Sequence, residues 1–109
     1  MEEEISIEDV HKLDLRAVKV TSCEKVEKSR SLLRIVVDVE GEEKQIISSI
    51  SQFYEPSELI GKTIVIVNNL KKAKFMGLES QGMLLAVEND DFLSLLTTDR
   101  ESPSGIKVS

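Results

Sequence analysis

Several features that common classes of protein depend on are scarce or missing in this 109-residue chain. It has a single cysteine, Cys23, so no disulfide can form within the chain, and we expect a reducing, cytoplasmic location. No apolar run approaches the ~20 residues of a membrane-spanning helix. The acidic start, MEEEIS, lacks the apolar stretch of a signal peptide. We therefore expect neither secretion nor a membrane partner.

The residues that usually carry catalysis or hold a metal are also scarce. His11 is the only histidine, so a zinc site, which needs about four closely spaced ligands, is not expected. We find no glycine-rich phosphate loop, and His11 has no candidate serine or cysteine partner for a nucleophilic triad. We expect no enzyme activity, no cofactor and no metal.

Charge is distributed unevenly along the chain. The net charge of −6 and the pI of 4.8 argue against general nucleic-acid binding. Yet residues 11–35 hold seven Lys or Arg against three acidic residues, and residues 61–85 hold four lysines against one glutamate. If these two segments meet in space, an acidic body carries one basic face, which would steer a polyanion to that face.

The hydrophobic pattern predicts an all-β domain with two short helices. Strands are expected over residues 14–20, 32–40, 44–50, 62–69 and 81–88, helices over 6–13 and 55–61, loops over 21–31 and 70–80, and a tail over 89–109 with a turn at Pro103 and Gly105. A helix between the third and fourth strands is typical of the OB-fold, a five-stranded Greek-key barrel. We expect one such domain over residues 1–109.

The OB-fold topology gives the two basic loops a common location. OB-folds bind ligands across the face of the second and third strands, between the loop that follows the first strand and the loop that follows the fourth. Loop 21–31 holds Lys25, Lys28 and Arg30. Loop 70–80 holds three lysines, Lys71, Lys72 and Lys74. Both sets of cations are therefore predicted to converge at the mouth of one groove.

Three stretches of the chain resemble the tRNA-binding OB-fold family. They are DLRAVKV (14–20), FYEPSELIGKTIVIV (53–67) and NNLKKAKFMGLESQGMLLAVE (68–88). The third is the most specific, because it combines Asn-Leu-Lys at 69–71 with Gly77, Ser80, Gly82 and Met83. The similarity covers roughly residues 5–109. Segment 26–34, VEKSRSLLR, departs from the His-Pro-x-Ala-Asp-Lys-Leu type stretch usual in the family.

The resemblance implies a non-catalytic module that binds tRNA by its shape and backbone. The family includes free-standing tRNA-binding proteins, β subunits and C-terminal domains of methionyl-tRNA synthetases, and a secretion-chaperone branch. Its short members are homodimers, so we expect a homodimer with residues from about 89–109 in the contact. The resemblance also allows a methionyl-tRNA synthetase catalytic chain as a further partner.

Ten residues are expected to form the tRNA site. They are Arg16, Lys28, Arg30, Arg34, Asn69, Lys71, Lys72, Lys74, Ser80 and Met83. The cations would contact phosphates, and the arginines could also stack on bases. Phe75 is the only aromatic residue in either loop, which argues against a long stacked single strand.

Several of these residues have an architectural alternative that the sequence leaves open. Arg16 and Arg34 could form ion pairs with Asp14 or Asp38. Asn69 could cap its turn, and both Ser80 and Met83 could serve the barrel itself.

Two other functions also remain open. A chaperone-like module would bind extended apolar peptides in the same groove, through Phe75, Leu78 and Met83. A structural assembly subunit would bind only a protein partner. Salt dependence separates these functions, because phosphate contacts weaken steeply with salt whereas apolar peptide binding should barely respond.

Overall fold

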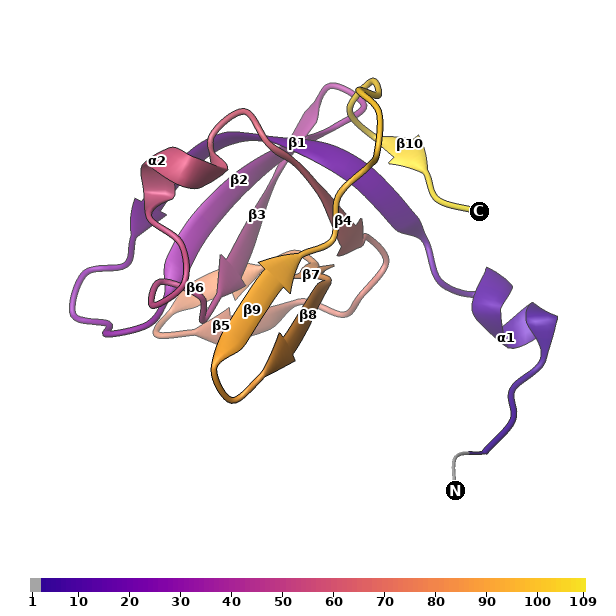
Figure 1. The fold of residues 1–109 in the computed structure, drawn as a ribbon, viewed down its shortest axis with the longest axis horizontal. Helices are drawn as coiled ribbons and strands as arrows, with labels where there is room; N and C mark the ends of the chain where they lie inside the picture. The colour runs from indigo at the N-terminus through magenta and orange to yellow at the C-terminus, as the bar shows by residue number, and fades with distance from the viewer. Residues whose placement is uncertain (1–2) are drawn as a thin grey trace.

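A curled antiparallel sheet forms the body of the computed structural model, which describes residues 3–109 (Figure 1). Its strands are β1 (Leu15–Lys25), β2 (Leu33–Val39), β3 (Glu42–Ser48), β4 (Thr63–Val67) and β7 (Met83–Leu84), bonded in the order β3-β2-β1-β4-β7. Helix α1 (Ile7–His11) precedes the sheet, and α2 (Pro56–Leu59) lies between β3 and β4. The predicted OB-like barrel is confirmed, including the place of the second helix.

Branched aliphatic side chains fill the barrel. The fully buried side chains are Leu33, Ile35, Ile46, Leu59, Ile64, Ile66, Val18, Val20 and Val37. In β2, the alternation of Leu33, Ile35 and Val37 directs these side chains inward, as the period-two pattern predicted. Leu59 joins α2 to the same core.

Three segments that were predicted to be irregular contain strands instead. β1 continues through residues 21–25, which were predicted to be loop. Segment 70–80 contains a hairpin of β5 (Ala73–Phe75) and β6 (Leu78–Ser80). The tail contains β9 (Phe92–Leu95), which pairs with β8 (Ala86–Asn89), and the strand predicted over 81–88 is divided into β7 and β8. These added strand segments are short and contain almost no fully buried side chains, so they lack the apolar alternation that marks a strand in a sequence.

The end of the tail also pairs with the sheet. β10 (Ile106–Lys107) lies antiparallel to the start of β1. The turn predicted at Pro103 and Gly105 is confirmed, and Gly105 adopts a φ of 99° that favours glycine.

Side chains close the barrel between its two end strands, β3 and β7. Gln45 and Gln81 exchange two bonds at 2.8 Å: the Gln81 N–H donates to the Gln45 carbonyl, and the Gln45 N–H donates to Gln81 Oε1. The buried Ser80 hydroxyl accepts from the Ile47 N–H at 3.0 Å and donates to the Gly82 carbonyl at 3.0 Å. Ser80 and Gln81 therefore satisfy backbone groups of β3 that a neighbouring strand would otherwise bond.

Gly82 completes this closure because it leaves room for the chain to pass. A Cβ atom at this position would lie 2.8 Å from the Val67 carbonyl oxygen and 3.0 Å from Ile46 Cδ1. Both distances are shorter than ordinary van der Waals contact. Ser80 and Gly82 of the family-like motif thus serve the architecture of the barrel.

Residues 3–109 contain no helix with the length and apolar character needed to cross a membrane.

We predict that Ser80→Ala destabilises the protein. The substitution leaves the buried Ile47 N–H without its acceptor, which should lower the free energy of unfolding by about 1–3 kcal/mol. Urea denaturation measures this change, with Ser57→Ala on the exposed side of α2 as the matched control. A loss below about 0.5 kcal/mol, the usual range for surface substitutions, would contradict the closure role.

Candidate functional site

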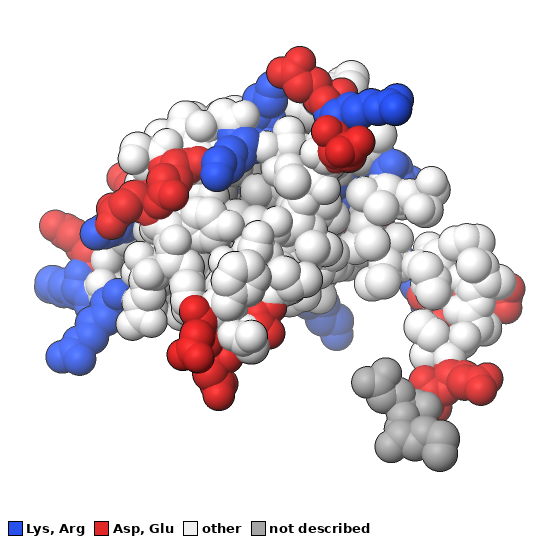
Figure 2. All heavy atoms as spheres, in the orientation of Figure 1, with Lys and Arg blue, Asp and Glu red and all other residues white. Residues whose placement is uncertain are grey.

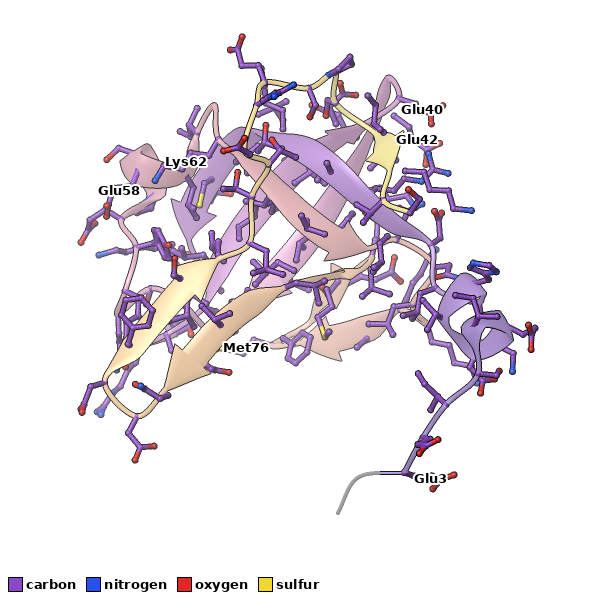
Figure 3. The ribbon with its side chains drawn as sticks, turned by 45° about the vertical axis from the view of Figure 1, so that its right-hand side comes forward. Glu3, Glu40, Glu42, Glu58, Lys62 and Met76 are labelled. Atoms are coloured by element: carbon purple, nitrogen blue, oxygen red, sulfur yellow. The ribbon has the colours of Figure 1, made fainter. Side chains whose placement is uncertain are left out.

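The β1–β2 loop (26–32) and the β5–β6 hairpin meet at one end of the barrel (Figure 1). Met76, at the turn of the hairpin and labelled in Figure 3, lines a hollow of about 590 Å³ together with Leu78, Val26 and Arg34. The two loops therefore meet at this hollow, whereas the convergence of their cations at one groove stays a prediction. The extension of β1 to Lys25 carries the first loop far enough to reach the hairpin.

Cations and carboxylates are interspersed at this end of the molecule (Figure 2). Arg34 donates from Nη1 to Glu24 Oε1 at 3.1 Å and from Nε to Gln45 Oε1 at 2.6 Å. Lys25 Nζ lies 3.7 Å from a carboxylate oxygen of Glu55. Exposed pairs of this kind contribute little to stability, so a phosphate can replace the glutamate at small cost.

The remaining cations of the two loops differ in their partners. Lys72 Nζ lies 3.8 Å from Glu79 Oε1. Lys28, Arg30, Lys71 and Lys74 are exposed and form no ion pair within residues 3–109. We call these four residues the unpaired cations. They are the groups best able to contact a polyanion without first giving up a partner.

Arg16 lies far from the β1–β2 loop but near the turn that leads into residues 70–80, because its partner Asp14 bonds Asn68 and Asn69. Its Nε donates to Asp14 Oδ1 at 2.7 Å, and its Nη1 donates to the Gly105 carbonyl at 2.9 Å and to Glu40. Arg16 and Lys25 stand near opposite ends of β1, about 30 Å apart at the usual rise of a strand. The alternative of an ion pair with Asp14 is what the structure shows, and Arg16 also anchors the C-terminal segment.

Asn69 has both ends of its amide engaged in the turn after β4. Its Oδ1 accepts from the Asp14 N–H at 2.9 Å, and its Nδ2 donates to the Lys12 carbonyl at 2.7 Å. Asn68, which the sequence did not single out, donates from Nδ2 to Asp14 Oδ2 at 2.9 Å. The two asparagines hold the end of β4 against the chain entering β1. Like the buried Ser80, Asn69 therefore has an architectural role in this structure.

Met83 borders an apolar hollow of about 130 Å³ next to the hairpin. Its lining includes the side chains of Leu70, Ala73 and Phe75, with Lys71 among its residues. Met83 is 47% exposed and Phe75 43% exposed, so part of each side chain remains open to solvent. We call this the Phe75 hollow. The sequence named Met83 but did not reveal that Leu70 would also be exposed here.

The side chains that could bind a metal or act as a nucleophile do not form a further site within residues 3–109. Residues 3–109 contain no cluster of three or more His, Cys, Asp or Glu side chains that could hold a metal ion. Partial burial raises the pKa of the Cys23 thiol to about 11, so this cysteine stays protonated near neutral pH.

Comparison with known proteins finds a matching family model and similar proteins. The family model described as "Putative tRNA binding domain" matches residues 15–107. The methionine–tRNA ligase of Clostridium acetobutylicum is 58% identical over 104 residues, which are 94% of this chain and 16% of the ligase. The chain thus spans about a sixth of the length of this relative.

Two solved structures have nearly the same size and fold. A methionyl-tRNA synthetase related protein from Pyrococcus horikoshii superposes with a TM-score of 0.92 at 34% identity, covering 99% of this chain and all of that one. The chaperone CsaA from Bacillus anthracis superposes with a TM-score of 0.87 at 32% identity, covering 98% of this chain and all of that one.

We predict that Asp14 makes the stability pH-dependent. Hydrogen bonds from Arg16 and then Asn68 hold the pKa of the Asp14 carboxyl below its usual range. A lowered folded-state pKa stabilises the protein above the unfolded pKa of about 3.9, and this stabilisation is lost as pH falls through the folded value. The difference in unfolding free energy between wild type and Asp14→Asn should therefore be full at pH 6 and shrink below about pH 4. A pH-independent difference would contradict this account.

Proposed function

The chain belongs to the tRNA-binding domain family whose model it matches over residues 15–107, and on this basis we propose that it is a non-catalytic module that binds tRNA by its backbone and shape. The observation that supports the proposal is that both basic segments present exposed cations without ion-pair partners within residues 3–109, in a protein of net charge −6. Contacts to phosphate supply affinity that does not depend on sequence. The acidic remainder would disfavour binding elsewhere on the surface.

The two loops would act as a clamp on the ribose–phosphate backbone. Lys71 and Lys74 come from the hairpin region, and Lys28 and Arg30 come from the β1–β2 loop, so phosphates could be contacted from two sides. Arg34 and Lys72 would join by exchanging Glu24 and Glu79 for phosphate, at the small cost of an exposed ion pair. Recognition through phosphates suits folded RNA, because side chains cannot read the deep, narrow major groove of an A-form helix.

The similarity to methionine–tRNA ligases supports a role beside a synthetase. We propose that the chain works as an auxiliary subunit of methionyl-tRNA synthetase or as a free-standing tRNA-binding protein, in the cytoplasm. A module that holds tRNA near a catalytic chain raises the effective tRNA concentration there without taking part in the chemistry.

We also propose that the chain forms a homodimer through α1. This five-residue helix projects from the barrel (Figure 1), and an isolated helix so short is unstable in water. Its apolar side chains Ile7 and Val10 are exposed, as is Leu13 just beyond it. Val10, Leu13 and Val108 line a hollow of about 420 Å³ against the end of the chain. A twofold partner would cover both the helix and this hollow.

Peptide binding is the alternative that the exposed apolar side chains favour. Phe75 and Met76 on the β4–β7 connection and Met83 at the start of β7 are all exposed, and flexible methionines suit adaptable apolar contacts. The similar chaperone CsaA shows that this fold occurs outside tRNA synthetases. The unpaired cations favour RNA, since an apolar peptide would make no use of them.

We predict that Lys71→Glu combined with Lys74→Glu weakens tRNA binding at least tenfold, or about 1.4 kcal/mol. Both side chains are exposed and unpaired, so the thermal midpoint should change little. Fluorescence anisotropy with labelled tRNA measures the affinity.

The matched control for this variant is Lys19→Glu combined with Arg100→Glu. It makes the same change in net charge at two exposed cations outside both loops. It should retain most of the affinity. Equal losses in the two variants would show that only net charge matters, and an unchanged affinity in the first variant would remove the hairpin from the mechanism.

We predict that Val10→Glu with Leu13→Glu converts a dimer into a monomer, because the charges would be buried in the proposed interface. Sedimentation equilibrium should give twice the 12.2 kDa chain mass for wild type and the single-chain mass for the variant. Val87→Glu replaces another exposed valine, on β8, and should remain dimeric. A monomeric wild type, or a dimeric double variant, would exclude α1 as the contact.

A further inference from the structure

We propose that the Phe75 hollow binds one unstacked nucleobase, whose phosphate lies against Lys71. The proposal rests on the proposed tRNA-binding function and adds to it a site for a single unpaired nucleotide. The hollow is apolar and is bordered by an unpaired cation, Lys71. This combination suits an anion that also has an apolar part.

The strand register of the hairpin explains why this hollow is apolar. Ala73 lies opposite Ser80, and Phe75 lies opposite Leu78, so these four residues share one face of the hairpin. Lys74 and Glu79 form the next pair and therefore point to the other face. The charged side chains of β5 and β6 are thus kept out of the hollow.

The hollow can receive part of one base. Its volume is about 130 Å³, slightly less than the roughly 150 Å³ of an apolar protein cavity that holds benzene, so the outer edge of the base would remain in solvent. Two stacked bases would not fit. Phe75 offers the ring face on which a base can stack, and Leu70 and Met83 offer apolar walls.

The polar groups around the hollow predict little preference among the bases. Ser80 contributes to the lining, but its hydroxyl already accepts from the Ile47 N–H and donates to the Gly82 carbonyl. It is therefore not free to hydrogen-bond the edge of a base. Stacking tolerates any base because each has a π face, so the site should select an unpaired nucleotide without selecting its identity.

Lys71 makes a nucleotide a better occupant than an apolar side chain of a peptide. It belongs to the residues that line the hollow, and it forms no ion pair within residues 3–109. A nucleotide places a phosphate within a few bonds of its base, and so satisfies the cation and the apolar walls together. An aliphatic peptide side chain would leave the lysine without a partner.

The first test uses amide chemical shifts of the isotope-labelled protein. AMP should shift the resonances of Ala73, Phe75 and Met83, whereas ribose 5-phosphate, which lacks the base, should leave them nearly unchanged. Equal shifts from both compounds would overturn the base site in favour of a phosphate contact alone. Shifts from a short apolar peptide but not from AMP would overturn it in favour of peptide binding.

The second test uses tRNA affinity. Phe75→Leu keeps an apolar side chain but removes the aromatic face, and should weaken binding about tenfold, within the range measured for loss of base stacking. Phe75→Tyr should retain wild-type affinity, as should Phe92→Leu, which changes an exposed phenylalanine outside the hollow. Wild-type affinity in Phe75→Leu would overturn the base site.

The two tests separate this inference from the function on which it rests. If tRNA binds but neither AMP nor Phe75→Leu has an effect, the base site is wrong and backbone recognition stands. If wild-type protein does not bind tRNA, the proposed function fails, and the base site fails with it.

Discussion

The closure of the barrel by Ser80 and Gln81 is the constraint on which the rest of the molecule depends. These two residues bond the backbone of β3 from the chain segment that enters β7. The β5–β6 hairpin ends at Ser80, so the same bonds that close the barrel also fix the hairpin against β3. Gln45 strengthens this attachment by donating from Nε2 to the Glu79 carbonyl at 2.7 Å. The position of the hairpin lysines and of Phe75 follows from this closure.

The cations in and beside the two loops differ in whether a carboxylate pairs with them. Some loop cations rest against glutamates, as Arg34 does against Glu24 and Lys72 against Glu79, whereas the unpaired cations extend into solvent. Under the proposed function, the unpaired cations would give a polyanion its first contacts, and the paired cations would be recruited afterwards by exchange. A protein of net charge −6 would in this way attract RNA to its basic loops while repelling it elsewhere.

The sequence predicted the barrel well because its central strands carry strong alternation, as in Leu33, Ile35 and Val37. The convergence of the two loops followed from topology alone. The sequence named both a structural and a binding role for Arg16, Asn69 and Ser80 but could not decide between them, because a motif does not show whether the fold or the ligand requires a residue. The partners of Arg16 and Asn69, Glu40 and Lys12, are distant in sequence and become neighbours only in the folded chain. The Phe75 hollow was likewise invisible, since it depends on the register of a hairpin whose strands have no clear pattern.

Affinity for tRNA measured across a salt series tests the central claim most directly. Phosphate contact by the unpaired cations predicts that log K falls linearly with log salt concentration, with a slope of roughly −0.7 to −0.9 for each contact. The four unpaired cations would therefore give a slope of about −3 to −4. Binding that is absent at low salt, or that is nearly insensitive to salt, would contradict recognition of tRNA through this surface.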